Sequence, residues 1–425
     1  MLPALYRSSC LTLTRLRRDR HGIIAIATGL TLTALVGFAG LAVDVGAWHV
    51  TQRRMQDAAD DAAFSAAVAA HAGGTPIASA KGITASAGFI DGQNGVTVVV
   101  NNPPTQGRYA GNGNGWEVVI TQPQERWFAS LYLSSPPVAS ARAVAHSQAG
   151  NSPYCVLALN QSGTGVKVSG SAAVSLSGCS MQVNSTGRSA LNVGGNSQLY
   201  ADTVSVTGDY VVGSSAQLLT TDPIDGPGAE PIPDPYANVQ IPSYSGCDGG
   251  NHTVVSATVT LQPGVYCDGL KVNSTAVVTL SPGIYIIDRG SFSVAGGAVV
   301  SGTGVTIVLT SSTSSNYATV TVNGGSTVNL TASAPSTPTA GLVFYEDRRA
   351  PSSATATLNG GSGQSYSGAL YFPSTSLTYS GNSGASACTQ VVAGAIVYTG
   401  NTTTSSNCTN TGVATISSYS TVLAE

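Results

Sequence analysis

An uncharged apolar run near the N-terminus limits how this chain can fold more than any other feature. Residues 22–43 read GIIAIATGLTLTALVGFAGLAV and contain no Asp, Glu, Lys or Arg. A helix of this length, rising 1.5 Å per residue, would measure about 33 Å, enough to cross the roughly 30 Å hydrocarbon core of a bilayer. The segment before the run is basic, and such a bias keeps that end in the cytoplasm. Its arginines are Arg7, Arg15, Arg17, Arg18 and Arg20. The run therefore predicts a cytoplasmic tail over residues 1–21, a transmembrane helix over 22–43 and the rest of the chain across the membrane.

Two interpretations of the apolar run differ in whether it stays in the mature protein. A cleaved signal peptide would use small residues such as Gly40 and Ala42 just before the cut. The apolar region of a signal peptide is usually about 7–15 residues long, which is shorter than this run. Because helix-forming sequence also continues beyond the run, we favour a retained anchor.

The sequence after the run predicts that the same helix continues as a stalk over residues 44–74. Alanine, the strongest helix former, fills its second half, and no proline interrupts it. Alanines such as Ala59 and Ala63 recur on one side, so this face can pack closely against a partner helix or against the chain's own domain. Asp44, at the start, is either an ordinary residue of the membrane interface or a functional acid within the membrane. Its position directly after the apolar run favours the interface.

The remaining sequence divides into a small module and a long β-rich domain. Residues 75–150 combine one short helical segment with three apolar strand patterns, which predicts an α+β module. Residues 151–425 alternate short Val, Ile and Tyr strands with Gly, Ser, Asn and Thr turns. In this part LQPGVYCDGL (residues 261–270) recurs 19 residues later as LSPGIYIIDR (280–289). Short strands and glycine turns with a period near 20 predict a mainly β fold, a parallel β-helix (solenoid), with a β-sandwich as the alternative.

One proline-rich segment interrupts the β-rich domain. Residues 222–242 (DPIDGPGAEPIPDPYANVQIP) contain six prolines. Such a composition predicts extended backbone, either as a linker or as a strap across the domain.

The cysteines beyond the apolar run fall into three local pairs. Cys155 and Cys179 are 24 residues apart, and the other two pairs, Cys247 with Cys267 and Cys388 with Cys408, are each 20 apart. Metal knuckles need shorter spacings, whereas an even number of cysteines beyond a membrane is typical of disulfides. We expect nearest-neighbour disulfides, with free buried thiols as the alternative. Cys10 precedes the membrane and has no nearby partner.

The charge content argues against several classes of function. Only 9% of residues are charged, and 17 Lys+Arg face 20 Asp+Glu, so no basic surplus supports nucleic-acid binding. The sequence contains no hydrolase elbow, Walker loop, zincin motif or dinucleotide fingerprint. We therefore expect no enzyme activity and no cofactor.

Two acidic features could nevertheless carry chemistry. Asp248, Asp268 and Asp288 are spaced by 20 residues, so they could stack as a carboxylate ladder that binds Ca²⁺. Asx turns before glycine explain these aspartates more simply. The cluster at residues 346–349 (Glu-Asp-Arg-Arg) could serve a polysaccharide lyase, although a self-neutralising surface loop is the better interpretation.

The anchor and stalk resemble a known family. The segment VDVGAWHVTQRRMQDAADDAAFSAAVA begins with an Asp-x-Gly formed by Asp44 and Gly46, followed by Gln56 and an Ala-Ala-Asp run at 58–63 that includes Asp60. In this pattern the chain resembles the N-terminal module of TadE/TadG-like Flp (Tad) pilus-assembly proteins. DPYANVQIP, the PGVY and PGIY repeats, GLVFYEDRR and SGALYFPSTSLTYSG are similar to the Gly/Ser-rich domain of the large members.

The resemblance implies a non-catalytic protein of the bacterial inner membrane that supports the assembly or anchoring of a pilus. Residues 75–150 would then be a pilin-like module, and the bulk would be periplasmic or extracellular. The expected partners are other pilus-assembly membrane proteins or pilin-like subunits, contacted through Asp44, Gly46, Gln56, Ala59, Asp60 and Ala63. The alternatives are a cell-surface adhesin that binds glycans and, third, an extracellular polysaccharide lyase.

Overall fold

The computed structural model describes residues 21–71, 74–149, 153–248, 251–333, 335–360, 363–380, 388–405, 407–408, 411–417 and 419–424. The predicted cytoplasmic tail, with its arginines and Cys10, lies outside the described residues except for its last position. The chain divides into two compact units, which are described separately below. Unit 1 comprises residues 1–148 and 421–425, and unit 2 comprises residues 149–420.

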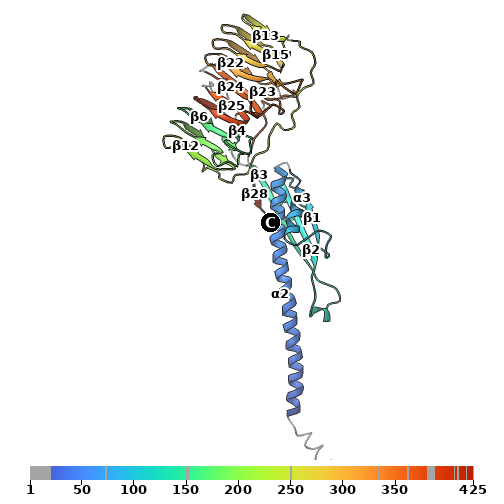
Figure 1. The fold of residues 1–425 in the computed structure, drawn as a ribbon. Helices are drawn as coiled ribbons and strands as arrows, with labels where there is room; N and C mark the ends of the chain where they lie inside the picture. The colour runs from blue at the N-terminus through green and yellow to red at the C-terminus, as the bar shows by residue number, and fades with distance from the viewer. Residues whose placement is uncertain are drawn as a thin grey trace, which may run out of the picture. The chain divides into compact units, whose positions relative to one another are not determined.

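Unit 1 is built on α2 (His21–His71), a continuous helix of 51 residues (Figure 1). Large apolar side chains in its first half are exposed; Leu30 and Phe38, for example, are 70% and 72% exposed. Among the described helices, α2 is the one that is long and apolar enough to cross a membrane, judged by length and composition. Transfer of this exposed apolar surface from water to a nonpolar environment would be favourable.

The second half of α2 packs against the rest of unit 1. Its alanine face, which includes Ala59 and Ala63, forms a buried cluster with sheet residues such as Val118 and Ile120. The short α3 (Pro76–Ser86) also packs on α2, as its buried Ala80 joins the same cluster. Because alanine is small, the helix can lie close to its neighbours. The sheet has the order β1 (Thr97–Asn101), β2 (Gly115–Pro123), β3 (Val138–Ala149) and β28 (Tyr419–Leu423), and β1–β2 and β2–β3 are antiparallel.

The last strand brings the C-terminal segment into the sheet of unit 1. β28 was assigned from sequence to the β-rich domain, yet it lies at the edge of the unit 1 sheet beside β3. Just after it, the Ala424 N–H donates to the Val144 carbonyl oxygen at 2.8 Å.

Unit 2 is mainly β, as predicted, and every described strand pair within it is parallel. A β-sandwich would require antiparallel sheets, so this alternative does not describe the pairing. The strands form a 20-stranded sheet and a 4-stranded sheet. They are β4 (Tyr154–Ala158), β5 (Val166–Val168), β6 (Ala173–Ser177), β7 (Ser180–Val183), β8 (Leu191–Val193), β9 (Gln198–Ala201), β10 (Val204–Val206), β11 (Tyr210–Val212), β12 (Gln217–Thr220), β13 (Asn251–Val255), β14 (Thr258–Leu261), β15 (Gly264–Val272), β16 (Val277–Leu280), β17 (Gly283–Asp288), β18 (Ser291–Val294), β19 (Val299–Thr303), β20 (Val305–Thr310), β21 (Thr319–Val322), β22 (Thr327–Thr331), β23 (Leu342–Glu346), β24 (Thr355–Asn359), β25 (Gln364–Ser380), β26 (Thr389–Tyr398) and β27 (Thr402–Ser405).

The register between paired strands differs from the period read in the sequence. Gly264 aligns with Tyr285, so these strands are 21 residues apart, although the similar motifs are 19 apart. Farther along, Val300 aligns with Val328 and Ile307 with Phe344. The turns between strands therefore vary in length, and a strict period of 20 is not observed.

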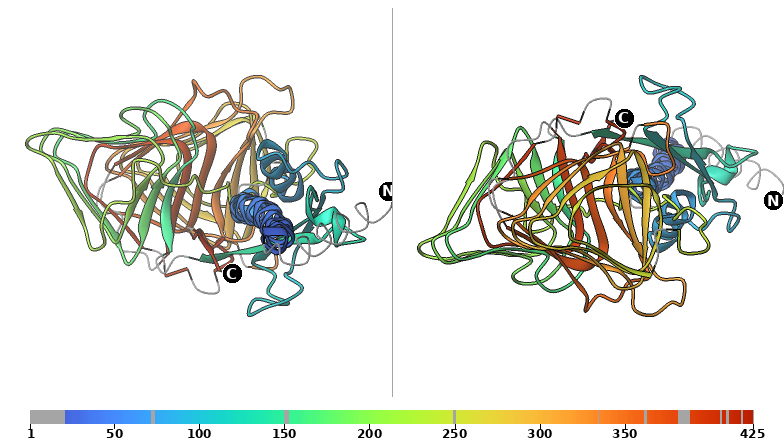
Figure 2. Two further views of the ribbon diagram at one scale, coloured as in Figure 1. Left: turned by 90° about the horizontal axis from the view of Figure 1, so that it is seen from below. Right: turned by 90° about the horizontal axis from the view of Figure 1, so that it is seen from above.

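The order of the strands in space is a circular permutation of their order in the chain. β4 pairs on one side with β7, which follows it closely in the chain. On its other side it pairs with β26, which lies near the end of the unit. β27 likewise pairs with β6. Figure 1 shows β12 at one end of the stack, followed by β4 and β6 and then by β25, β22 and β15, and Figure 2 shows the same stack from below and from above. The chain thus enters unit 2 in the middle of the stack and later returns from the opposite end.

The interior of unit 2 is lined by stacked apolar side chains, many of them aromatic. Val, Ile and Leu at alternate strand positions point inward, as the period of a strand requires. Phe344 lies 5.9–6.1 Å, between ring centroids, from Phe292, Tyr366 and Phe372. Such contacts stabilise neighbouring strands that are far apart in sequence.

The proline-rich segment is a strap over this stack rather than a free linker. Its Ile232 and Tyr236 are buried in a second cluster, against Val308, Tyr345 and Tyr371 of the sheet. The strap covers Val308 on the outer face of β20, whereas Val305, Ile307 and Leu309 of the same strand face the interior. The strap therefore connects the two ends of the stack along its outside.

Candidate functional site

A long loop of unit 1 folds back onto the exposed half of α2. This β2–β3 loop (residues 124–137) joins two antiparallel strands and contains the single short 3-10 helix η1 (Ala129–Leu131). It contacts α2 close to the end of the predicted membrane span.

Asp44 of α2 holds the loop through three main-chain hydrogen bonds. Its carboxylate accepts from the N–H groups of Trp127, Phe128 and Ala129 at 3.3, 2.9 and 2.5 Å. The loop leaves Asp44 only 1% exposed, so its carboxylate is covered by the chain itself. The carboxylate instead satisfies three N–H groups at the start of η1, and hydrogen bonds to a charged acceptor are stronger than neutral ones.

Small residues on the same face of α2 make room for the loop. A Cβ atom at Gly40 would lie 2.6 Å from Cγ of Phe128, and one at Gly37 would lie 3.3 Å from the hydroxyl oxygen of Tyr132. One turn beyond Asp44, the indole N–H of Trp48 donates to the Glu125 carbonyl oxygen at 2.8 Å. The loop is thus attached to four successive turns of one helix face.

The loop itself is apolar and exposed. Between Arg126 and Val138 it contains no charged residue. Its exposed large apolar side chains are Trp127, Phe128, Leu131, Tyr132 and Leu133, at 56, 45, 79, 71 and 41%. Tyr132 also borders a shallow apolar cavity on α2 that is lined by Leu30, Gly37, Phe38 and Leu41.

The other predicted partner residues of α2 have different surroundings. Ala59 and Ala63 are completely buried against other residues of unit 1. Of the two possibilities raised by the sequence, this is packing against the chain's own domain rather than against a partner helix. Gln56 donates to Asp60 at 2.8 Å and to the Arg142 carbonyl oxygen at 3.0 Å, so it joins α2 to the sheet. Gly46 is exposed. The structure thus brings Gln56, Asp60 and the alanines into one intramolecular contact, away from Asp44.

A buried ion pair, which the sequence analysis did not identify, strengthens the sheet of unit 1. Glu117 is buried and accepts from Arg142 Nε at 2.6 Å, from the Thr105 hydroxyl at 2.7 Å and from Asn101 at 2.8 Å. Burial alone would raise the pKa of this carboxyl, but the Thr105, Asn101 and Arg142 donors lower it to about 2. Glu117 is therefore a structural anion. Only its proximity to Arg142 in the folded sheet reveals that role.

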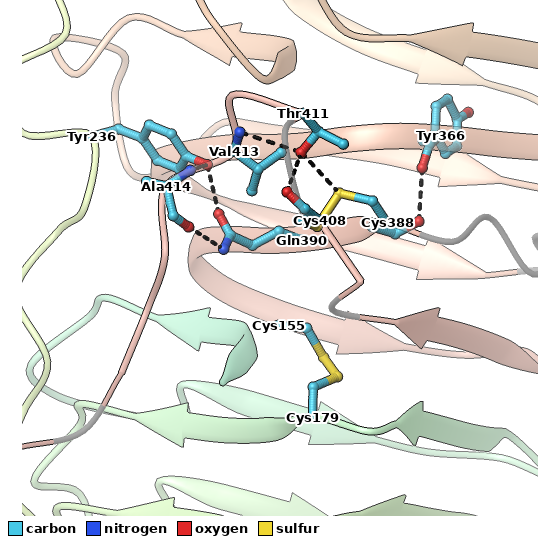
Figure 3. The surroundings of a disulfide bond; sticks show 11 residues. Cys155, Cys179, Tyr236, Tyr366, Cys388, Gln390, Cys408, Thr411, Val413 and Ala414 are labelled. Atoms are coloured by element: carbon cyan, nitrogen blue, oxygen red, sulfur yellow. Dashed lines mark hydrogen bonds between the residues drawn. A yellow bond between two sulfur atoms is a disulfide. The ribbon is translucent and has the colours of Figure 1, made fainter. Parts of the chain in front are cut away.

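The six paired cysteines form the disulfides Cys155–Cys179, Cys247–Cys267 and Cys388–Cys408, with Cα separations of 5.7, 5.6 and 4.7 Å. Figure 3 shows the first and third of these in neighbouring layers of the stack. Cys155 lies on β4, and Cys388 lies directly before β26, so the two flank the place where these strands pair. The second disulfide links Cys247, five residues beyond the strap, to β15. The first and third disulfides therefore lie where the circular arrangement is closed, and the second fastens the chain that follows the strap.

The three aspartates do not form a ladder. Asp288 aligns with Cys267 rather than with Asp268, because one extra residue shifts the register. Asp288 is buried and accepts from the Ser312 N–H at 2.6 Å and from the Ser312 hydroxyl at 2.8 Å, whereas Asp248 and Asp268 are exposed. Asp268 instead lies 3.5 Å from Arg289. Within the described ranges, no group of three or more His, Cys, Asp or Glu residues is arranged to hold a metal ion.

The charged cluster after β23 fastens the strap instead of forming a surface loop. Glu346 and Asp347 are each 2% exposed, which a solvated loop would not produce. Arg348 donates to the carbonyl oxygens of Tyr236 and Val239 in the strap and lies 3.3 Å from Asp234. Arg349 pairs with Asp347 at 2.6 Å. The cluster is therefore a structural clamp between strap and sheet.

The β2–β3 loop is an element of the candidate site that the sequence patterns did not single out. Its signal is an aromatic, uncharged stretch, RWFASLYLSSPP (residues 126–137), placed between two strand patterns. A soluble hairpin loop would normally be polar. The sequence could have indicated this contrast, but not that Asp44 is the partner.

An exposed apolar helix continuous with a folded, mainly β chain fits the class of membrane-anchored proteins. Residues 22–70, nearly the whole of α2, match the Tad family model, described as "Putative Flp pilus-assembly TadE/G-like". The match confirms the resemblance seen in the sequence over this segment and indicates a pilus-related role. Neither a curated protein nor a solved structure matches the chain.

Proposed function

We propose that this chain is a non-catalytic scaffold of the bacterial inner membrane that supports the assembly or anchoring of a Tad/Flp-type pilus. Its N-terminus would lie in the cytoplasm, and unit 2 would be a solenoid in the periplasm or outside the cell. The observation that carries the proposal is that the matched residues coincide with α2, which extends without interruption from an exposed apolar half into the core of unit 1.

The packing of α2 supports a mechanical role. Its second half is held by the alanine cluster, and its first half bears the β2–β3 loop through Asp44. A force on the folded part of unit 1 would therefore be transmitted to the anchor through a packed helix rather than through a flexible linker. This is what a scaffold that holds a filament or its assembly machinery requires.

Four buried carboxylates of the chain have structural partners, as expected for a scaffold. Asp44, Glu117, Asp288 and Glu346 are buried, and each accepts hydrogen bonds from donors of the chain itself. A catalytic carboxylate would instead face a cleft in which a substrate could reach it.

The exposed half of α2 offers the surface for membrane partners. In a bilayer its small residues allow close helix packing, and such packing drives helix association in lipid. We therefore expect other pilus-assembly membrane proteins or pilin-like subunits to bind here.

The test is co-purification of the full-length, tagged protein from detergent-solubilised membranes of its own bacterium. Pilus-assembly proteins should co-purify, and deletion of the gene should abolish pili. The matched control replaces residues 22–36 by an unrelated apolar helix and keeps Gly37, Gly40 and Asp44. It should retain membrane insertion but lose the partners. Normal pili after deletion would contradict the proposal, and loss of surface attachment alone would favour an adhesin.

A further inference from the structure

The depth of the β2–β3 loop along α2 is set by its contacts. Gly40 and Gly37 precede Val43, the end of the uncharged run, by three and six residues. At 1.5 Å per residue these positions lie about 4.5 and 9 Å inside the end of the span, if α2 crosses along the membrane normal. Phe128 and Tyr132, which contact these glycines, must then lie at a similar depth.

The chemistry of the loop matches that depth. Its tip, residues 127–135, presents exposed Trp, Phe, Leu and Tyr side chains together with Ser130, Ser134 and Ser135, and no charge. Interfacial elements bury their apolar side chains about 5–10 Å below the headgroups, and Trp and Tyr are enriched at that level. The charged residues of the loop are Glu125 and Arg126, which lie on the side of the loop nearer the sheet.

The loop also supplies internal partners for part of its irregular backbone. N–H groups without partners are costly in hydrocarbon, so non-helical backbone at this depth needs internal acceptors. Asp44 accepts from three consecutive N–H groups, and Arg126 donates to the Leu133 carbonyl oxygen at 2.7 Å. The Asp44 carboxylate, at the edge of the span, thereby satisfies N–H groups at the start of η1 that would otherwise lack partners in the membrane.

We propose that the β2–β3 loop is a second membrane-contact element, which inserts beside α2 into the leaflet from which the folded part of unit 1 emerges, with Asp44 as its positioning residue. The occupant of the exposed apolar surface is lipid. The inference rests on the membrane span of the proposed function. Two attachments at one interface fix the tilt and rotation of α2, which a lone helix leaves open.

Spin-label depth measurements on the full-length protein test this proposal. Because Cys10 is the single cysteine outside the three disulfides, a Cys10→Ser background allows one nitroxide label at a time. Leu131→Cys reports the loop, Leu35→Cys the span and Val99→Cys the sheet; these side chains are 79, 64 and 44% exposed. Each variant is reconstituted in vesicles of phosphatidylcholine and phosphatidylglycerol, and its accessibility to oxygen and to a water-soluble nickel chelate is compared.

The labels at positions 131 and 35 should favour oxygen, and the label at position 99 should favour nickel. A label at 131 as open to nickel as that at 99, with 35 still in lipid, would overturn the loop proposal and favour a protein partner. A label at 131 shielded from both reagents would also overturn it, since a second copy would then cover the loop. Water exposure at 35 would overturn the span itself.

A second variant tests the positioning role. Asp44→Ala in the Leu131→Cys protein should move the label from lipid to water, whereas Asp44→Asn, which keeps an acceptor oxygen, should preserve part of the immersion. The label at 99 reports whether the sheet remains folded. Unchanged immersion in Asp44→Ala would refute the assignment of Asp44.

Discussion

The free energy of unfolding of the native protein should fall as the pH rises from acidic to neutral, and replacing Glu346 by Gln should abolish this fall. Glu346 ends β23 and is 2% exposed. Its carboxyl accepts from the Thr375 hydroxyl at 2.7 Å and from the Ser374 N–H at 3.3 Å. Burial raises its pKa from the ordinary 4.5 to about 7, because these donors compensate only part of the lost hydration and Asp347 adds repulsion.

The sign and size of the effect follow from that difference in pKa. Below about pH 4.5 the carboxyl is protonated in both states, and its contribution to stability is fully present. As the pH rises toward 7, the unfolded chain releases the proton while the folded chain retains it, so the free energy of unfolding falls. At 1.36 kcal/mol per pH unit the total loss is about 3 kcal/mol, and it is complete once the pH exceeds the folded pKa. In unit 2 this corresponds to roughly 5 °C in Tm.

The two units can be followed separately in one sample of full-length protein in detergent. All three tryptophans, Trp48, Trp116 and Trp127, belong to unit 1, so their fluorescence reports that unit. Near-ultraviolet circular dichroism of the buried tyrosines, such as Tyr366 and Tyr371, reports unit 2. Thermal unfolding is recorded from about pH 4 to pH 8 for the native protein and for Glu346→Gln.

We expect the tyrosine transition of the native protein to fall relative to that of the variant as the pH rises, with the tryptophan transition unaffected. Glu230→Gln is the matched control, because Glu230 lies in the same unit but is exposed. Parallel pH profiles for native protein and Glu346→Gln would refute the reasoning, as would a control that behaves like Glu346→Gln.

Three further predictions concern the strap, a disulfide and the sheet of unit 1. Arg348→Ala should weaken unit 2 by about 2 kcal/mol, because charged hydrogen bonds to the strap are lost, and limited proteolysis should then cut the strap first. Cys388→Ser with Cys408→Ser should cost about 3 kcal/mol, from the entropy of the loop of 20 residues that the bond closes, measured as the tyrosine Tm against the native protein with its disulfides intact. Glu117→Gln should lower the free energy of unfolding of unit 1 by roughly 2–3 kcal/mol at pH 7, measured by tryptophan fluorescence. Because the folded pKa of Glu117 is lowered to about 2, this difference from the native protein should be fully present above pH 4.5 and should disappear as the pH falls to 2 and below. The strap prediction would be contradicted if proteolysis cut another site first, and the disulfide prediction if the Tm did not change. The Glu117 prediction would be contradicted if the difference between native protein and variant persisted in acid.

Local patterns predicted much of this architecture. The apolar run and the alanine-rich segment predicted one long helix, since helix formation depends on residues three and four positions apart. The short Val and Ile strands with glycine turns predicted parallel β structure. Cysteines about 20 residues apart suggested disulfides because neighbouring turns of such a fold bring similar positions together.

Contacts between distant residues could not be predicted in the same way. The pairing of β26 with β4 joins Val391 to Val156, and no local pattern distinguishes this match from pairing with any other parallel strand. The variable length of the turns likewise broke the apparent period of 20, so Asp248, Asp268 and Asp288 were not brought together. The cluster at 346–349 looked like a solvated loop only because the strap that covers it is about 110 residues away.

The sequence by itself determined that the chain has an apolar anchor continuous with a helix, and that a sparsely charged β domain follows. Both depend on composition and short periodicity, which each segment carries alone. Only the tertiary structure decided what Asp44 does, since its three donors are 83 to 85 residues away along the chain. A carboxylate after an apolar run is compatible with many surroundings. The burial and the donors that give it a role are supplied by a loop whose position depends on the packing of the whole unit.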